Sequence, residues 1–341
     1  MAYRKFLLLF LSILFFNACN QAGFVRAEFI FGTICSVRFF DKVEDRVYKE
    51  IFGRLREIDN RMSVNIDNSD VAQINAAAGV TPVRIHDDVF QVIERALYFS
   101  ELSGGAFDIT VGPLVLMWGI STDNPRVPSD QEIDSALMLI NWRDVELDSE
   151  TKSVFLKHTG MSVDLGAIAK GYAADEAAKI TRQAGIKRAI INLGGNIYVC
   201  GENKNRSLWR VGIQNPAGQR NEYTGIVQTE EAAVVTSGVY ERFFDFNGTR
   251  YHHIFSPFSG FPAVNGLLSV TIIAPNSMDA DALSTAIFVM GFETGFPLIK
   301  SLPGIDAIFI FDDYNVAKTS GADFSITDMD FSFNYRGELS P

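Results

Sequence analysis

The chain has 341 residues, of which 47% are hydrophobic and 21% charged, and its formal net charge at pH 7 is −11. These values describe an ordered globular protein with enough chain for a substantial core, and they exclude an intrinsically disordered one. The negative charge argues against a nucleic-acid partner, because that class of protein normally carries a basic patch. Four histidines and three cysteines leave little material for a zinc or iron–sulfur site.

The N-terminus has the order of a secretory signal. Two positive residues precede the apolar run Phe6–Phe16, which is too short for a comfortable membrane span, and Cys19 follows closely. A cysteine in that place resembles the lipidated first residue of a bacterial lipoprotein. We therefore predict a signal peptide over residues 1–18 and a mature domain over residues 19–341, anchored to a membrane through Cys19 and facing the periplasm. A soluble secreted protein cut nearby and an uncleaved anchor are the alternatives.

In the first half of the chain, apolar spacing predicts helices between short strands. A helix is expected over residues 41–60, because its apolar residues recur at helical intervals. Ser69, Asp87 and Ser129 are expected to cap three further helices. The expected strands are Glu28–Phe40 (interrupted at Gly32), Val145–Leu147 and Val154–Leu156. Cys35 is expected to be a buried thiol, as is Cys200, because their separation in sequence gives no reason to pair them.

In the second half, short strands outnumber helices. Helices are expected over Leu165–Ala184 and Met278–Gly291, and Asn247-Gly248 between aromatic strands predicts a hairpin with a type I′ turn. The expected strands are Ala189–Asn192, Ile197–Val199, Arg210–Ile213, Ala232–Thr236, Phe243–Phe246, Tyr251–Phe255, Leu267–Ala274 and Ala307–Phe311. Hairpins without a regular alternation of strand and helix favour an α+β fold over a doubly wound one.

The helix expected over Met278–Gly291 carries oxygen-bearing side chains beside an apolar stripe. Asp281 and Thr285 lie one turn apart on the same face, with Ser284 beside them. Mg²⁺ prefers oxygen ligands and completes its shell with substrate phosphates and water, so this face can form half of a magnesium site. The structural alternative is that Asp279 caps the helix and the hydroxyls are tolerated inside it.

Five short stretches place glycine or another small residue beside a polar group where a strand ends or a helix begins. They are Gly105–Thr110, Asp164–Gly171, Asn192–Asn196, Thr236–Gly238 and His252–Pro257, the last followed by Ser259-Gly260. Each alone fits a tight turn, but such loops also let backbone N–H groups approach an anion. Lys170 falls on the second turn of its expected helix, from where it can reach a phosphate. Together these features indicate a diphosphate ligand.

Asp164 and the histidine pair are candidates for more specific roles. Asp164, at the start of its expected helix, can cap N–H groups or bind a ligand hydroxyl. His252 and His253 cannot point the same way on a strand, so one is expected to be structural and the other to serve as a general base. No Walker A, GxGxxG, HExxH, CxxC-pair or serine-nucleophile motif is present.

Taken together, these motifs resemble those of the ApbE family of FAD:protein FMN transferases. The resemblance extends from Phe31 to Gly291. The stretches that carry it are Phe31-Gly32-Thr33, Met62-Ser63, Ala106–Val115, Asp164–Asp175, Ile191–Asn196, Thr236–Phe244, His252–Pro257 and Asp279–Ala286. It implies two lobes with FAD in a cleft between them, Mg²⁺ held against the diphosphate, and transfer of FMN to a Thr or Ser hydroxyl of an exported redox protein with release of AMP. Lipoproteins are common in that family, which supports the expectation at Cys19.

The resemblance also implies the site residue by residue. Metal ligation falls on Asp281 and Thr285, with Ser284 close by, and on the backbone carbonyl of Ala167. Flavin and nucleotide contacts fall on Phe31, Ala106, Phe107, Asp108, Asp164, Lys170, Ser237, Gly238 and Phe255. His253 is expected to be the base that takes the proton of the acceptor hydroxyl, with His252 as the other choice.

One position departs from the family pattern. Where members usually have an aromatic residue shortly after the Met-Ser pair, this chain has Asn65. An aromatic ring there would stack on the dinucleotide, which is worth on the order of 1 kcal/mol. We hypothesise that Asn65 loosens the hold on FAD and admits water, so that FAD is hydrolysed to FMN and AMP besides being used for transfer. The alternatives to FMN transfer are a Mg²⁺-dependent FAD pyrophosphatase and, in another class, a non-catalytic lipid-anchored flavin-binding or solute-binding protein.

Overall fold

The computed structural model describes residues 24–203, 207–219 and 221–333. The predicted signal peptide and the predicted lipidation site at Cys19 lie outside these residues. Within the described ranges, no helix combines the length and the apolar character needed to cross a membrane. The localisation predicted from the N-terminus therefore stays a prediction.

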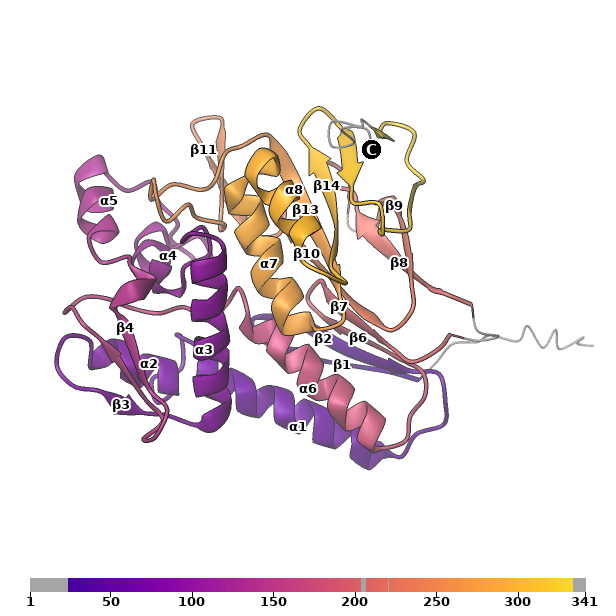
Figure 1. Ribbon diagram of the computed structural model, residues 1–341, viewed down its shortest axis with the longest axis horizontal. Coiled ribbons are helices and arrows are strands. Elements are labelled where there is room, and N and C mark those ends of the chain that lie inside the picture. The colour runs from indigo at the N-terminus through magenta and orange to yellow at the C-terminus, as the bar shows by residue number, and fades with distance from the viewer. Residues whose placement is uncertain (1–23, 204–206, 220, 334–341) are drawn as a thin grey trace, which may run out of the picture.

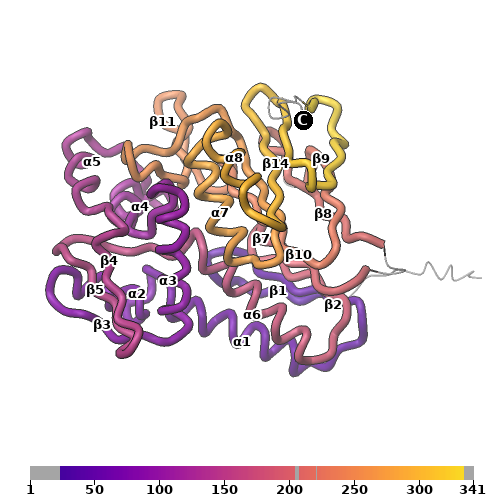
Figure 2. Tube along the Cα trace, in the orientation of Figure 1, coloured from indigo at the N-terminus to yellow at the C-terminus, as the bar shows by residue number. Residues whose placement is uncertain are grey.

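A nine-stranded sheet forms the centre of the molecule (Figures 1 and 2). Its strand order is β1-β2-β6-β7-β10-β13-β14-β15-β17, and all neighbours are antiparallel except β15 and β17. The strands are β1 (Phe24–Ile30), β2 (Thr33–Phe39), β6 (Ala189–Leu193), β7 (Asn196–Cys200), β10 (Ala232–Gly238), β13 (Leu267–Ala274), β14 (Asp306–Phe311), β15 (Asn315–Lys318) and β17 (Ser332–Phe333). Strands from both ends of the chain are thus part of one sheet.

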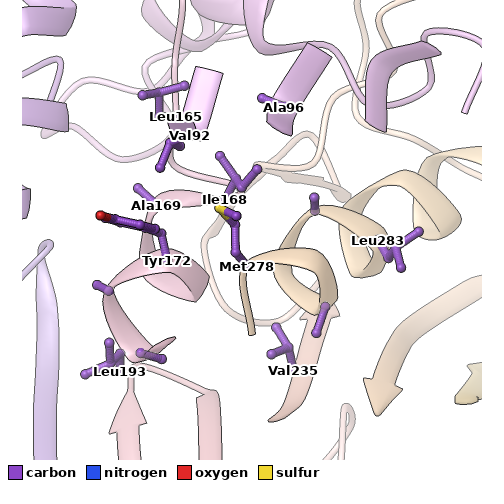
Figure 3. Close-up of a cluster of buried hydrophobic side chains, with 14 of the residues drawn as sticks. Val92, Ala96, Leu165, Ile168, Ala169, Tyr172, Leu193, Val235, Met278 and Leu283 are labelled. Carbon is purple, nitrogen blue, oxygen red and sulfur yellow. The ribbon is translucent and has the colours of Figure 1, made fainter. Parts of the chain in front are cut away.

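The two faces of this sheet are covered differently. One face packs against helices α1 (Asp45–Met62), α6 (Ala169–Gln183), α7 (Ser277–Met290) and α8 (Phe292–Ser301) in the main hydrophobic core. Figure 3 shows Tyr172 of α6 on one side of Met278 in this core, and Leu283 of α7 on the other. The other face packs against a three-stranded sheet of β8 (Trp209–Gln214), β9 (Tyr223–Thr229) and β16 (Phe324–Ile326). Alternating residues of the strands serve the two cores, since neighbouring side chains point to opposite faces.

A second part of the chain lies beside the sheet and is drawn in violet in Figure 1. It contains α2 (Asp70–Ala76), α3 (Asp87–Leu102), α4 (Gly112–Trp118), α5 (Asp130–Leu137), two 3₁₀ turns (Ile109–Val111 and Trp142–Asp144), and a small sheet of β3 (Val83–Arg84), β5 (Ser153–Leu156) and β4 (Val145–Asp148). A hairpin of β11 (Phe243–Phe246) and β12 (Thr249–His252) projects near α4. The predicted α+β class with largely antiparallel sheets is confirmed. A ligand cleft between the two parts stays a prediction.

Several local predictions are confirmed. Strands β11 and β13 have the predicted bounds, and Asn247 and Gly248 both have positive φ, as a type I′ turn requires. Ser69 and Ser129 cap α2 and α5 through their side chains. Cys35 is a buried free thiol, and so is Cys200.

Three local predictions are wrong. The strand expected over Glu28–Phe40 is interrupted at Gly32 as predicted, but its two parts form a hairpin, because Phe31 (φ 54°) and Gly32 (φ 66°) make a two-residue turn between β1 and β2. Helix α6 begins at Ala169 rather than Leu165, so Lys170 lies in its first turn rather than its second. The expected caps also differ, since His86 precedes α3 in place of Asp87, and Asn276 caps α7 in place of Asp279. Asp279 instead forms an ion pair with Arg95 of α3, at 2.7 Å.

Candidate active site

The crossing of α6 and α7 positions the oxygen-rich helix. Gly171 of α6 permits it, because a Cβ there would lie 2.7 Å from Met278 Cα and 2.8 Å from Asp281 Cβ. The Gly171 N–H donates to Asp281 Oδ2 at 2.9 Å. Asp175, one turn further along α6, accepts the N–H groups of Ser277 and Met278, each at 2.8 Å. Two carboxylates and one glycine therefore hold the helices together and place Asp281 at the crossing.

Four oxygen-bearing side chains meet beside this crossing. Asp281 is buried, with 4% of its surface exposed. Ser237 Oγ, at the end of β10, lies 2.8 Å from Ser284 Oγ and 3.2 Å from Thr285 Oγ1. Ser284 Oγ donates to the Asp281 carbonyl oxygen at 2.9 Å. The structure thus brings Ser237 together with the three predicted metal-site residues of α7.

The backbone before α6 leads into the same crossing. Ala167 lies two residues before α6 begins, and Gly171, the third residue of α6, has no partner for its N–H within the helix and donates to Asp281 instead. A carboxylate, hydroxyls and a backbone carbonyl form the kind of hard-oxygen donor set that Mg²⁺ accepts. Across the described residues no three His, Cys, Asp or Glu side chains gather in a metal-binding arrangement. A metal here would therefore have one carboxylate ligand, neutral oxygens, and water or substrate oxygens.

Lys170 supplies the positive charge next to Asp281. Its Nζ lies 3.7 Å from Asp281 Oδ1 and donates to the Gly166 carbonyl oxygen at 3.1 Å. A buried carboxylate needs such a partner, since removing a charge from water without one is costly. The Lys170 ammonium therefore compensates Asp281 in the protein without a ligand, and it lies where an anion would be attracted.

Asp164 and the stretch around Asp108 lie side by side. The Asp164 N–H donates to the Ile109 carbonyl at 2.8 Å, which joins two of the predicted glycine-bearing stretches. Burial raises the pKa of the Asp164 carboxyl, although its Oδ1 accepts the Gly166 N–H at 2.7 Å. Asp164 therefore closes the turn before α6 and does not cap the helix directly.

The carboxylate of Asp108 accepts three hydrogen bonds from neighbouring groups of the protein. It accepts the N–H and hydroxyl of Thr110 and the N–H of Trp142, at 2.8, 2.6 and 3.0 Å. Burial nevertheless raises the pKa of Asp108. Ala106 and Phe107, just before it, are 3% and 2% exposed. The predicted ligand contacts of these three residues stay predictions.

The two histidines have different surroundings, as their alternation on a strand predicts. His252 is 5% exposed; its Nε2 lies 3.0 Å from the Ala263 carbonyl oxygen, and its Nδ1 accepts the Ile254 N–H at 3.2 Å. This pattern requires a neutral ring with the proton on Nε2. Burial lowers the pKa of His252 to about 4. Both ring nitrogens are used by the backbone, so His252 is a structural residue.

His253 keeps one ring nitrogen free for chemistry. Its Nδ1 lies 3.2 Å from the Arg242 carbonyl oxygen, so Nδ1 carries the proton and Nε2 is left as an acceptor. Burial, followed by the positive charge of Arg242, lowers the pKa of His253 to about 3, and Lys170 contributes in the same direction. Lys170, Arg242 and His253 therefore lie close enough to influence one another.

Arg242 was missed by the sequence analysis. It lies between β10 and β11, and a Cβ on Gly32 would be 3.8 Å from its Nη2. Its positive charge lowers the pKa of Asp164, against the effect of burial, and lowers the pKa of His253, in the same direction as burial. The only signal in the sequence is that Arg242 belongs to the Thr236–Phe244 stretch, since a single arginine beside a hairpin is otherwise unremarkable.

The other predicted contact residues are placed as follows. Phe31 is half-buried in the β1–β2 turn, and its N–H donates to Asp59 Oδ2 at 3.2 Å. Phe255 is buried, with its ring centroid 5.9 Å from that of Trp118, away from the solvent. Asn65 is exposed in the loop after α1, where its N–H donates to Ser63 Oγ at 3.2 Å. Gly238 leaves room for the Tyr240 ring, because a Cβ there would lie 2.6 Å from it. No ligand contact of these four residues is tested by this arrangement.

Two surface hollows lie away from the predicted site residues. One, of about 390 Å³, is lined by Pro113, Met117, Gln131, Glu132, Ser135, Ala136 and Leu139. The other, of about 640 Å³, is lined by Asp41, Arg182, Ile186, Lys187, Arg188, Cys200, Gly201, Glu202, Asn203 and Glu231. Neither hollow is lined by a residue of the α6–α7 crossing, so both are separate from the candidate active site.

Comparison with known proteins places this arrangement in a family. The model of the ApbE family matches residues 31–309. The chain is 40% identical over 313 residues to a FAD:protein FMN transferase of Treponema pallidum (strain Nichols), covering 87% of this chain and 86% of that protein. It is 37% identical over 290 residues to a FAD:protein FMN transferase of Klebsiella pneumoniae (strain 342), covering 85% and 90%.

Solved structures agree with the sequence comparison. The crystal structure of the ApbE protein from Thermotoga maritima superposes with a TM-score of 0.80 at 32% identity, covering 87% of this chain and 97% of that one. The flavin transferase ApbE from Vibrio cholerae superposes with a TM-score of 0.76 at 27% identity, covering 89% and 95%.

Proposed function

This chain belongs to the ApbE family, and from that premise we propose that it transfers FMN from FAD to a Thr or Ser hydroxyl of an exported redox protein in a Mg²⁺-dependent reaction. It is an enzyme, and FAD is its substrate. The observation that carries the finer proposal is the meeting of Asp281, Ser284, Thr285 and Lys170 at the α6–α7 crossing, with the free Nε2 of His253 nearby.

Each residue of the crossing has a role that follows from its surroundings. Asp281, the Thr285 hydroxyl and the Ala167 carbonyl would hold Mg²⁺, with Ser284 and Ser237 supporting them. Mg²⁺ held there would offset the negative charge of the diphosphate and polarise its phosphorus–oxygen bonds. Lys170 attracts the same diphosphate, because its ammonium carries a positive charge beside Asp281.

His253 is the proposed general base. Its Nε2 takes the proton of the acceptor hydroxyl as that oxygen forms a bond to the FMN-side phosphorus, and the bond to the AMP-side oxygen breaks. Without a ligand, two cations and burial keep the pKa of His253 at about 3. A bound diphosphate adds negative charge beside these cations, which raises the pKa of His253 and makes it a stronger base.

Two substitutions test this proposal with purified protein, FAD and an acceptor peptide. Asp281→Ala is expected to lose Mg²⁺-dependent turnover, whereas Asp279→Ala on the same helix breaks only the ion pair with Arg95 and should retain it. His253→Ala is expected to retain FAD and to transfer FMN about 10²-fold more slowly or worse. FMN-labelled peptide and released AMP are measured together. Full transfer by the His253 variant would remove this residue from the mechanism.

A second candidate activity is hydrolysis of FAD to FMN and AMP, which the exposed Asn65 favours. With no aromatic side chain at this position, one stacking contact with the dinucleotide is missing and water has easier access. FAD incubated with Mg²⁺ but without acceptor distinguishes the cases: a hydrolase releases AMP, a strict transferase does not, and a flavin-binding protein leaves FAD intact under every condition. Asn65→Tyr is expected to tighten FAD binding and to slow hydrolysis; unchanged hydrolysis would reject the role of Asn65.

A further inference from the structure

We propose that the guanidinium of Arg242 binds the phosphate of the FMN half of FAD and holds it during transfer. This inference rests on the proposed function and adds to it a residue that recognises the transferred phosphoryl group. Its basis is the position of Arg242 between the proposed base and the β1–β2 turn, together with the charges that surround it.

The backbone of Arg242 is hydrogen-bonded to the proposed base, His253. Its carbonyl oxygen accepts the His253 N–H at 3.1 Å and lies 3.2 Å from His253 Nδ1. The side chain extends toward the β1–β2 turn, since a Cβ added to Gly32 would lie 3.8 Å from Arg242 Nη2. One residue thus orients the base through its carbonyl and presents its guanidinium to the Phe31-Gly32 turn.

Arg242 differs in its ion pairs from Arg250, an arginine of the β11–β12 hairpin. Arg250 pairs with Asp245 at 3.0 Å and stacks on Phe243. For Arg242, the structure of residues 24–203, 207–219 and 221–333 shows no carboxylate in an ion pair with its guanidinium. Asp164, the carboxyl that its charge influences, has its Oδ1 committed to the Gly166 N–H. The guanidinium is therefore available to an anion.

The two cations of the site have different neighbours. Lys170 belongs to the Asp281 crossing, where the metal is proposed, whereas Arg242 adjoins His253. His253 must reach the acceptor hydroxyl as it attacks the FMN-side phosphorus, so the neighbouring guanidinium faces the oxygens of that phosphate. The planar fork of arginine matches two phosphate oxygens, and charge spread over those oxygens in the transition state strengthens the contact.

The test compares FMN with riboflavin, which lacks the phosphate, using Arg242→Gln. The substitution keeps the backbone carbonyl that orients His253, so it removes the guanidinium alone. Arg250→Gln makes the same change of charge on the β11–β12 hairpin and is the matched control. Flavin fluorescence titration of the purified full-length protein gives both dissociation constants, and circular dichroism with thermal unfolding verifies that each variant is folded.

We expect Arg242→Gln to raise the dissociation constant for FMN about 10-fold or more and to leave that for riboflavin unchanged, because charge-assisted hydrogen bonds are lost only with the phosphate. Arg242→Lys should recover part of the FMN affinity, and Arg250→Gln should bind both as the wild type does. Equal losses for FMN and riboflavin, or no loss for FMN, would overturn the inference. A wild-type protein that transfers no FMN would instead reject the proposed function. The dissociation constants for FMN and riboflavin would still test whether Arg242 binds the phosphate.

Discussion

At the scale of single residues, neighbouring side chains of the same type take opposite roles because of what surrounds them. His252 and His253 follow one another, yet the backbone uses both ring nitrogens of the first and only one of the second. Asp279 and Asp281 are also close in sequence, and the first pairs with Arg95 while the second lies beside Lys170. Two residues of the same type have the same chemistry, and their positions in the fold decide which of the two belongs to the candidate site.

The buried His252 predicts a pH dependence of stability. Its pKa is about 4 in the folded protein and near 6.5 when unfolded, so between these values the unfolded state binds more protons. The free energy of unfolding should therefore fall, by on the order of 3 kcal/mol from this residue, as the pH drops from 6.5 to 4. His252→Gln, which keeps a donor and an acceptor, should flatten this fall in urea unfolding experiments.

The control for this prediction is His158→Gln, because the His158 side chain is 57% exposed. It changes an exposed histidine instead of a buried one, so the comparison isolates the effect of burying the ring. Parallel curves for wild type and the His252 variant between pH 4 and 6.5 would contradict the assignment of His252 as a buried neutral ring.

At the scale of elements, the contact between α6 and α7 is what builds the candidate site. Gly171 lets the helices approach, Asp175 caps α7 from α6, and Gly171 donates to Asp281 across the contact. Arg54 of α1 reinforces α6 from the other side through Glu176 at 3.0 Å. A site of this kind depends on the separation of two helices more than on either helix alone.

Gly171→Ala should push these helices apart. The added Cβ would meet Met278 Cα at 2.7 Å and Asp281 Cβ at 2.8 Å, contacts that rigid helices cannot absorb. We expect the free energy of unfolding to fall by roughly 2 kcal/mol, within the usual range for overpacking, and FAD affinity to fall with it. Thermal unfolding and flavin fluorescence measure the two effects.

Gly53→Ala is the matched control, since Gly53 also lies inside a helix but a Cβ there meets nothing within 4 Å. It should raise stability by roughly 0.5–1 kcal/mol, because alanine restricts the unfolded chain and favours the helix. A Gly171 variant that gains stability in the same way would show that the helices tolerate separation.

At the scale of the whole molecule, segments far apart in sequence form one sheet and one site. β2 pairs with β6, β6 with β7, and β10 with β7, so the Phe31-Gly32 turn and the end of β10 lie at the same end of the sheet, where Ser237 contacts Ser284 and Thr285 of α7. The first described strand, β1, starts at Phe24, five positions after Cys19. An anchor at Cys19 would therefore hold the catalytic domain close to a membrane surface.

We propose that Cys19 carries this anchor, and Cys19→Ser tests it. The variant is expected to move from the membrane fraction to the soluble fraction and to lose labelling by a radioactive fatty acid, while FMN transfer by the purified domain is unchanged. Immunoblots of the two fractions measure the distribution. A variant that stays in the membrane fraction with an uncut N-terminus would favour the uncleaved anchor instead.

Much of the local structure could be predicted from the sequence, because it depends on neighbours in the chain. The Asn247-Gly248 turn requires positive φ at two residues, and Ser69 and Ser129 cap helices that begin immediately after them. The interruption at Gly32 was predicted, but the reversal of the chain there was not, because it needs Phe31 at positive φ, which is unfavourable for a phenylalanine. Lys170 was placed one turn too late, because the Asp164–Gly166 hydrogen bond delays the start of α6.

The sequence by itself determined the family, the α+β class and the chemical types at the site, since ordered motifs and short-range patterns survive without coordinates. Only the tertiary structure decided that the backbone engages both ring nitrogens of His252 but one of His253. It also decided that Gly171 donates its N–H to Asp281 and that Arg242 reaches the Phe31-Gly32 turn. The reason is physical. Gly171 and Asp281 are 110 positions apart, and such contacts depend on how helices and strands pack, which local preferences do not specify.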